Sequence, residues 1–319
     1  NSGGAKIHKS DGCGTILKLD DYARATLITG ASEIGQGIDA VLCQIVSEEL
    51  GIAISDITVV NNDSAIGPWD VGVHASRTTF VAGNSVLRAA RSARRQILEA
   101  ASEQLDIPAP DLDLRSGHVV QHATGIAMIR LDRLLRRMHF RQDSRLVMVT
   151  DYYEPPSVRE DENHMGDLSA SWAYAAYVAE VEVDTGTGEV RVIRMTAAQD
   201  VGRVMNRIGL EGQIEGGIAI GLGYALSEQL KFDQGKVLNP SFRDYKVMTA
   251  PEMPEVEMHF IESNCPEGPM GAKGVAELPA IVTAPAVANA VYNAIGIRFF
   301  DPPLTPEKVA RALYAHDRE

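Results

Sequence analysis

The sequence predicts an α+β (mixed α/β) protein with two lobes. Some segments show apolar residues at strand spacing and others at helix spacing. The succession of a hairpin, a polar loop and a helix occurs in both halves of the chain, which indicates two similar lobes. With 319 residues, 45% of them apolar, the chain is long enough for two cores. We expect a first lobe over residues 1–150 and a second over 151–319.

The first half begins with alternating apolar residues that predict a β-hairpin, with Asp20 and Asp21 at its turn. An apolar face at helical spacing follows, and Gly51 ends that helix. Prolines interrupt residues 106–170, where we expect less regular structure. The expected elements are strands over 15–19 and 23–29, a helix over 38–50, a strand over 57–60 and a helix over 83–105.

The second half opens with a clear hairpin pattern, whose turn runs from Asp184 to Gly188. A glycine-rich helix and a further strand then lead to a loop that carries Glu277. The expected elements are strands over 172–183 and 190–197, a helix over 210–230, a strand over 256–261 and helices over 281–295 and 306–314.

Composition excludes several classes of protein. The net charge of −13 disfavours nonspecific nucleic-acid binding, which depends on neutralising phosphates. Cys13, Cys43 and Cys265 are far apart and form no CxxC pair, so neither a disulfide framework nor an Fe–S or zinc site is predicted. Cys43 falls on the apolar side of its helix. We expect reduced thiols and a cytoplasmic protein.

The uncharged run over 278–297 is long enough to raise the question of a membrane span. It contains two prolines and two asparagines, so we expect a buried helix instead. No signal peptide opens the chain, and it starts at Asn1 without a methionine. We therefore expect a processed or truncated polypeptide.

Four loops share one character: small residues, then one or two polar groups, then a helix. A loop before a helix presents free backbone N–H groups at the positive end of the helix dipole, where anions bind. Gln36 and Gln213 add both donors and acceptors. The combination suits a large polar ligand with a phosphate and a heterocycle, although no GxxxxGK[ST] or GxGxxG fingerprint is present. The loops are 34–37, 74–79, 211–217 and 271–279.

The loop with Glu277 is the most informative of the four. Its glycines and alanines allow a backbone to pass close to a bulky group, and one carboxylate follows where a helix begins. This pattern is typical of a buried general base, and a solvated surface glutamate is the alternative. For the other loops, Gln36 and Gln213 could be capping residues. The glycines from Gly216 to Gly223 could serve helix packing, and His74 could face a ligand or be structural.

In their order and spacing, these motifs resemble the C-terminal half of the molybdopterin-binding large subunit of the xanthine oxidase family (molybdenum hydroxylases). The resemblance covers nearly all 319 residues. The motifs are Glu33-Ile34-Gly35-Gln36-Gly37, Ala75-Ser76-Arg77 followed by Gly83-Asn84, Val178–Asp184, Asp200-Val201-Gly202-Arg203, Glu211-Gly212-Gln213-Ile214-Glu215-Gly216, Gly221-Leu222-Gly223 and Lys273-Gly274-Val275-Ala276-Glu277.

The resemblance implies a two-lobed molybdenum-cofactor-binding fold with Glu277 as the catalytic base. It implies no protein ligand to the metal, which the dithiolene of the pterin holds. Gly35 and Gln36 would contact the cofactor, Gln36 near the metal-side oxo or pterin groups. The other implied contacts are Ala75, Ser76, Arg77, Thr78 and Thr79 around the pterin and its phosphate, Gln213 bonded to the pterin, and Lys273, Gly274, Val275 and Ala276 through their backbone.

The implied reaction is hydroxylation of an N-heterocycle or an aldehyde with water as the oxygen source. The implied cofactor is molybdopterin in its cytosine dinucleotide form, and electrons would pass to Fe–S and FAD groups in partner subunits. Two alternatives remain open: reductive dehydroxylation of an aromatic acyl-CoA, which occurs in the same family, and a non-catalytic cofactor-binding or assembly subunit.

The chain also departs from the family pattern. Ala276 stands where the family has glycine, and Arg207 follows Asn206 where the family has proline after asparagine. The N-terminal half of the subunit has no counterpart here, so we expect a partner chain that carries it, or a truncated chain. The other expected partners are an Fe–S subunit, an FAD subunit and a small-molecule substrate, with neither nucleic acid nor membrane.

Overall fold

The computed structural model describes residues 10–158 and 160–316 and confirms the α+β class. The chain divides into two compact units, Asn1–Trp172 with Asn264–Gly274, and Ala173–Ser263 with Val275–Glu319. The boundary expected at residue 150 differs from this division. It falls inside β7 (Met148–Tyr153), whose backbone pairs with β1 (Cys13–Leu19) of the first unit. The return of 264–274 to the first unit was also not predicted.

A four-stranded sheet in the order β3-β2-β1-β7 forms the centre of the first unit. The predicted hairpin is confirmed, with β2 (Ala25–Thr29) antiparallel to β1. β2 begins two residues later than expected because Ala23 adopts a positive φ of 64° in the turn. β3 (Ile57–Val60) lies parallel to β2.

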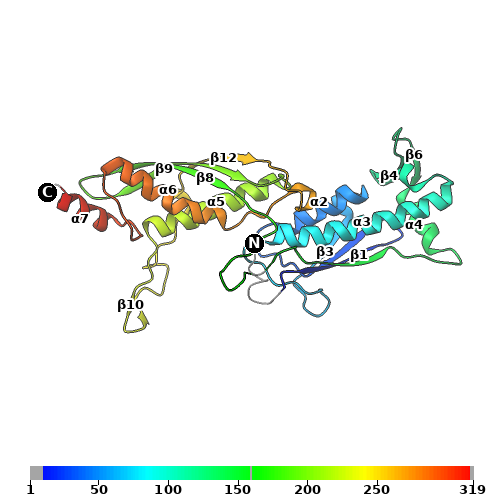
Figure 1. Cartoon of the computed structure of the whole chain (residues 1–319), viewed down its shortest axis with the longest axis horizontal. Coiled ribbons are helices and arrows are strands. Elements are labelled where there is room, and N and C mark those ends of the chain that lie inside the picture. Colours follow the sequence, from blue (N-terminus) through cyan, green and yellow to red (C-terminus); the bar gives the residue numbers. More distant parts are fainter. Residues whose placement is uncertain (1–9, 159, 317–319) are drawn as a thin grey trace. The chain divides into compact units, whose positions relative to one another are not determined.

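Two helices pack on this sheet (Figure 1), α2 (Ile38–Leu50) against β3 and α3 (Thr78–Leu105) against β1 and β7. Gly51 ends α2 in the left-handed conformation, with φ 62°. Cys43 is buried, as expected. α3 begins five residues earlier than predicted, because the buried Phe80 and Val81 extend its apolar face toward the N-terminus.

Residues 106–170 are more regular than the sequence suggested. They contain a small antiparallel sheet in the order β4-β5-β6. Each of its strands has four residues, too few for a clear alternating pattern. Helix α4, which carries several arginines, buries Leu131, Leu134, Leu135 and Met138 at helical spacing. The elements are β4 (Leu112–Arg115), β5 (His118–Gln121), β6 (Ala127–Arg130) and α4 (Leu131–His139).

The second unit has a three-stranded sheet in the order β12-β9-β8. β8 and β9 form the predicted hairpin, and β12 lies parallel to β9. Buried residues of β9, α5 and α6, including Met195, Ile218 and Val287, form its core. The elements are β8 (Ala175–Val183), β9 (Val190–Asp200), α5 (Arg207–Leu226), β10 (Phe232–Asp233), β11 (Lys236–Val237), β12 (Glu255–Ile261), α6 (Leu278–Ile295) and α7 (Pro306–His316). Short 3₁₀ turns cover Ile54–Asp56, Ala109–Asp111, Ala250–Glu252 and Pro269–Gly271.

Helices α5 and α6 approach each other closely through small residues. A Cβ atom on Gly217 would lie 2.6 Å from Cβ of Pro279, and one on Gly221 would lie 2.5 Å from Cβ of Thr283. These two glycines therefore serve helix packing, which was one of the alternatives considered.

We expected α6 to be a buried helix, but only one of its faces is buried. Four of its residues are buried, and they recur at helical spacing. By length and composition it is the one helix among the described residues that could cross a membrane, and 22% of its apolar window is buried. The buried residues are Pro279, Thr283, Val287 and Val291.

Each unit has the same order of elements, a hairpin, a helix, a strand parallel to the second hairpin strand, and a second helix. In the first unit, loops that follow the parallel strands β2 and β3 lead into α2 and α3. In the second unit, loops that follow β9 and β12 lead into α5 and α6. Ligands of such sheets bind beyond the carboxyl ends of parallel strands. The fold therefore places the predicted motifs where ligand-binding loops are expected.

Candidate functional site

The loop before α2 does not present a free helix terminus, contrary to our expectation. Oε1 of Glu33 accepts hydrogen bonds from the backbone N–H groups of Gly35 (2.7 Å) and Gly37 (3.0 Å), and Oε2 accepts from Asp39 N–H (3.2 Å). Partial burial acts to raise the pKa of Glu33, but these backbone hydrogen bonds outweigh it and lower the pKa. The chain thus supplies its own anion at this helix start.

Gln36 closes the same loop. Its Oε1 accepts from the N–H of Ile34 (2.7 Å), and its Nε2 donates to the carbonyl of Ser32 (2.9 Å). Gly35 is exposed, with a φ of 103°, and no heavy atom lies within 4 Å of the position that a Cβ would take. The backbone at Gly35 is therefore open to a ligand, while the amide of Gln36 already has two partners within its loop.

The loop before α3 contains two consecutive non-glycine residues with positive φ, Ala75 at 54° and Ser76 at 52°. Such conformations cost about 1–3 kcal/mol each and persist where surrounding structure holds them, often at functional sites. Thr78 and Thr79 then start α3, and the N-cap residue Arg77 makes no side-chain capping hydrogen bond. Of the starts of α2 and α3, that of α3 fits an anionic group better.

The side chain of Arg77 is not placed to bind a phosphate. It is 1% exposed, and protein atoms engage its guanidinium on all sides. Nε donates to Oδ1 of Asp11 (2.6 Å), and Nη1 donates to both carboxylate oxygens of Asp70 (3.1 Å each). The remaining bonds go to the carbonyl groups of Asp11, Gly12 and Gly72. Arg77 therefore fixes the loop from the inside, and a direct contact with a ligand could come only from its backbone.

The cluster around Arg77 contains two carboxylates and one guanidinium, all nearly inaccessible to water. Burial raises the pKa of Asp11, although the neighbouring Arg77 acts in the opposite direction. Burial, together with the charge of Asp70, also raises the pKa of the Cys13 thiol. Cys13 is therefore an inert buried thiol, and the cluster is structural.

The segment 264–274 packs on the first unit beside this loop. The side-chain amide of Asn84 on α3 donates to the carbonyl of Glu267 (2.9 Å). A Cβ on Gly83 would lie 2.7 Å from Cγ of Pro269, so α3 needs glycine at this contact. A Cβ on Gly274 would overlap the carbonyl oxygen of Ser76. The segment thus brings Lys273 and Gly274 to the loop before α3.

Two further hydrogen bonds complete the arrangement in the first unit. Nζ of Lys273 donates to the carbonyl of Trp172 (2.6 Å), which holds this side chain on the first unit. The amide of Asn62 donates to the carbonyl of Glu33 (3.1 Å), which links the loops before α2 and α3. The predicted residues that the first unit brings together are Gly35, Gln36, Ala75, Ser76, Arg77, Thr78, Thr79, Lys273 and Gly274.

The second unit carries Gln213, Val275, Ala276 and Glu277. We expected Gln213 in a loop, but it lies within α5, where it is half-buried. The start of that helix is capped by Asn206, whose Oδ1 accepts from Gly209 N–H (3.1 Å). Glu277 is the N-cap residue of α6 and is exposed. The burial that we expected for this carboxylate is therefore not provided by the chain itself.

Four residues that shape these loops were not predicted in that role: Asp11 and Asp70 were not singled out, and Glu33 and Asn84 were quoted only as parts of motifs. Glu33 and Asp70 carry a local signal, because each carboxylate accepts a hydrogen bond from the backbone N–H of a glycine two residues further on. A carboxylate at this short spacing often bonds in this way. Asp11 and Asn84 act on segments far away in the sequence, so no local pattern reveals them. In the described part of the chain, no three His, Cys, Asp or Glu side chains form a group that could hold a metal ion.

Comparison with known proteins shows the family of the chain. Residues 2–254 match the family model described as molybdopterin cofactor-binding domain. The chain is 33% identical over 92% of its length to the 6-hydroxypseudooxynicotine dehydrogenase complex subunit gamma of Paenarthrobacter nicotinovorans. It is 32% identical over 93% of its length to the putative xanthine dehydrogenase molybdenum-binding subunit XdhA of Escherichia coli. A crystal structure of Cu,Mo-CO dehydrogenase superposes on 95% of the chain with a TM-score of 0.84 and 25% identity.

The chain thus belongs to the molybdopterin cofactor-binding domain family, and its relatives are molybdenum-binding subunits of the xanthine oxidase family. It spans only part of those relatives, 36% of the first and 38% of the second. It likewise covers 38% of the CO dehydrogenase chain. The fold that the resemblance implied is confirmed, and the residues assigned to the site remain predictions.

Proposed function

We propose that the chain is part of the molybdopterin-binding subunit of a hydroxylase that oxidises an N-heterocycle or an aldehyde with water as the oxygen source. The observation that supports this most is the packing of Gly274 on Ser76, because it joins two of the motifs by direct backbone contact. The name of one relative, nicotine 6-hydroxylase large subunit, describes hydroxylation of an N-heterocycle by that protein.

The residues of the first unit fit a pterin with a phosphate. The start of α3 offers backbone N–H groups near Thr78 and Thr79, and Gly35 offers an open backbone. When bound, the cofactor would supply a metal centre that accepts two electrons from the substrate. The chain's own contribution would be to hold the cofactor through the loops before α2 and α3, in which Glu33 and Arg77 fix the conformation from within.

Glu277 would act as the base of the reaction, holding a proton on its carboxylate. As the N-cap residue of α6, Glu277 is attached to a rigid helix, because Pro279 and Thr283 of that helix are buried against α5. Gln213 of α5 would hydrogen-bond the pterin. Both assignments follow the family resemblance, and the half-buried Gln213 amide has donors and acceptors for that role.

We further propose the cytosine dinucleotide form of the cofactor, and Fe–S and FAD subunits that accept the electrons. The relatives' names, complex subunit gamma and large chain, describe parts of multi-subunit complexes and support such partners. Acid hydrolysis of the purified holo-complex should release CMP. Release of GMP or AMP, or of no nucleotide at all, would contradict the dinucleotide assignment.

The exchange Glu277→Gln tests the function. A positioned base contributes about 10²–10⁴-fold to a rate, so turnover of N-heterocycles and aldehydes should fall by at least that factor. The molybdenum content of the purified complex should stay near normal. Glu257→Gln, at an exposed position on β12, is the matched control and should retain turnover. Unchanged turnover of Glu277→Gln would remove this residue from the mechanism.

A further inference from the structure

An arm of residues 227–250 follows α5 in the second unit (Figure 1). Its far end is the hairpin of β10 and β11, in which Phe232 pairs with Val237 and Asp233 with Lys236. Gln234 and Gly235 form the turn, both with positive φ (45° and 81°). A two-residue turn of this kind matches the twist of the strands that it joins. The arm therefore ends in a regular turn.

Side-chain hydrogen bonds hold the arm in shape at two levels. The Asn239 side chain is buried, where its Oδ1 accepts from the N–H of Lys231 (2.9 Å) and its Nδ2 donates to the carbonyl of Gln229 (2.8 Å). At the base, Oγ of Ser227 donates to the carbonyl of Lys246 (2.9 Å). These bonds join the outgoing and returning strands, so the arm is a built structure.

The arm nevertheless exposes its largest apolar side chains. The exposed fraction is 59% for Phe232, 55% for Leu238 and 82% for Phe242. A hairpin of two strands is at most marginally stable alone in water. Apolar residues gathered on such an element mark a contact surface for a partner.

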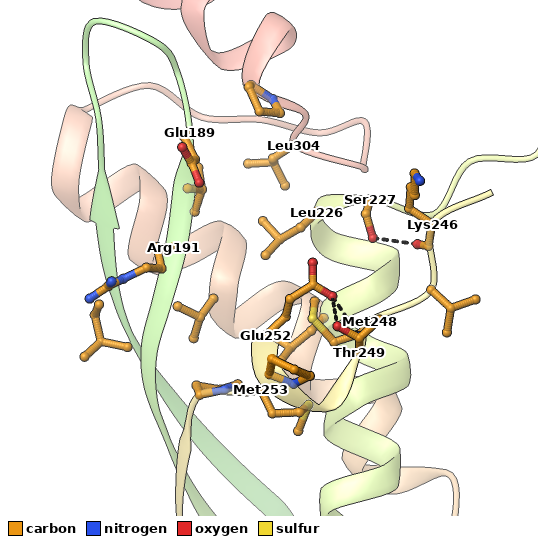
Figure 2. A pocket seen from close by; sticks show the side chains of 18 of the residues that line it. Glu189, Arg191, Leu226, Ser227, Lys246, Met248, Thr249, Glu252, Met253 and Leu304 are labelled. Carbon is orange, nitrogen blue, oxygen red and sulfur yellow. Dashed lines mark hydrogen bonds between the residues drawn. The ribbon is translucent and has the colours of Figure 1, made fainter. Parts of the chain in front are cut away.

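A groove of about 1200 Å³ adjoins the base of the arm (Figure 2). Its lining includes Leu226 from α5, Met248 from the returning strand of the arm, and Leu304. Phe242 also lines it, so the groove and the arm form one continuous surface. Sites for small molecules have volumes of about 300–1,000 Å³, and this larger groove suits a polypeptide segment better.

We propose that the arm and groove bind the remaining polypeptide of the molybdopterin-binding large subunit, whether it is a separate chain or continuous with this one. The proposal rests on the function proposed above. Since this chain aligns with 36% of one relative and 38% of another, more than three fifths of each subunit lies outside it. A polypeptide of that size is available to cover an apolar surface of this extent.

Site-specific cross-linking in the purified holo-complex tests the proposal. A benzoylphenylalanine in place of Phe232 or Phe242 should cross-link to a peptide that matches the part of the large subunit outside this chain. Phe140 at the end of α4 is 80% exposed, close to the 82% of Phe242. It serves as the matched control position, where we expect no cross-link to the same peptide. Cross-links from the arm to a second copy of this chain, to an Fe–S or flavin subunit, or to nothing would overturn the proposal.

A second measurement uses substitutions. Phe232→Glu together with Phe242→Glu should lower the yield of assembled complex more than tenfold, whereas Phe140→Glu should leave it unchanged. An undiminished yield of the arm variant would contradict docking. The molybdenum content of the unsubstituted complex separates the two proposals, because a complex without molybdenum contradicts the function, while a molybdenum-containing complex with a solvent-exposed arm contradicts the docking alone.

Discussion

Gly274 lies with its backbone directly against the carbonyl oxygen of Ser76, so closely that a Cβ on Gly274 would overlap that oxygen. The two residues are far apart in the sequence and belong to different motifs. Ser76 is held with a positive φ of 52°, so neither partner of the contact can move without changing the backbone around it. The contact fixes the segment 264–274 on the loop before α3.

Gly274→Ala should therefore displace one of these two segments. We expect the molybdenum content of the purified complex to fall at least tenfold, because the loop before α3 is the anion-binding candidate of the first unit. Metal analysis of the variant checks this. A normal molybdenum content would show that the contact is not needed for cofactor binding. Gly216→Ala is a control for folding, because its Cβ would meet open space on α5 and should stabilise that helix by up to about 1 kcal/mol.

Arg77→Met should destabilise the first unit strongly. The exchange leaves Asp11 and Asp70 buried without their cation, and breaking a buried ion pair in this way costs about 3–5 kcal/mol. Arg77→Lys should recover only part of the loss, because one ammonium group cannot reproduce the planar guanidinium fork. Urea unfolding measures both. Arg91→Met breaks the exposed ion pair with Glu49 and should cost less than 1 kcal/mol. An equal loss of stability in Arg77→Met and Arg91→Met would contradict the special role of the buried ion pairs.

Asp113 should contribute to stability in a pH-dependent way. Burial acts to raise its pKa, but hydrogen bonds from Arg94, Arg115 and the N–H of Leu114 outweigh this and lower the pKa to about 2. Because the folded pKa lies below the ordinary value of 3.8, the stabilisation is present above pH 3.8 and is lost as the pH falls through about 2. We expect Asp113→Asn to cost about 1 kcal/mol at pH 7, given the partial exposure of the cluster. Urea unfolding at pH 7 and pH 2 should show this difference become much smaller at the lower pH, and an undiminished difference there would contradict the assignment.

Gln213→Ala should lower the bound molybdenum without lowering the stability of the chain. Alanine has the higher helix propensity, and the side chain of Gln213 is only half-buried, so α5 should remain folded. The measurements are metal analysis and the thermal midpoint of the same preparation. Glu215→Ala changes an exposed side chain two residues further on and should leave the molybdenum content unchanged. Equal molybdenum in both variants would remove Gln213 from the cofactor site.

Most of the fold could be predicted from local patterns. The hairpins, the helix from Ile38 to Leu50 and the strand over 255–261 follow from apolar spacing and from turn residues such as Gly51. The short strands over 112–130 could not be predicted, because four residues do not establish a period. The division of the chain was missed because β7 pairs with β1 across more than a hundred residues, and no local signal carries such a contact.

The candidate site was predicted only as a set of motifs. Their residue types indicated four loops, but they did not indicate the hydrogen-bond partners of the side chains in those loops. The motif around Arg77 predicted contact with a phosphate, but Asp11 and Asp70 bind its guanidinium. The loop before α2 was expected to have free backbone N–H groups, but Glu33 accepts hydrogen bonds from them. A carboxylate that serves its own chain and one that serves a ligand look identical in sequence.

The assignment of 264–274 to the first unit means that the polypeptide passes from one unit to the other three times, after Trp172, after Ser263 and after Gly274. Neither unit is encoded by one uninterrupted stretch of sequence. A protease cut at any single one of these junctions would leave both units joined covalently. A gene fragment that ends at the first junction would yield the first unit without the segment 264–274, to which Asn84 is hydrogen-bonded.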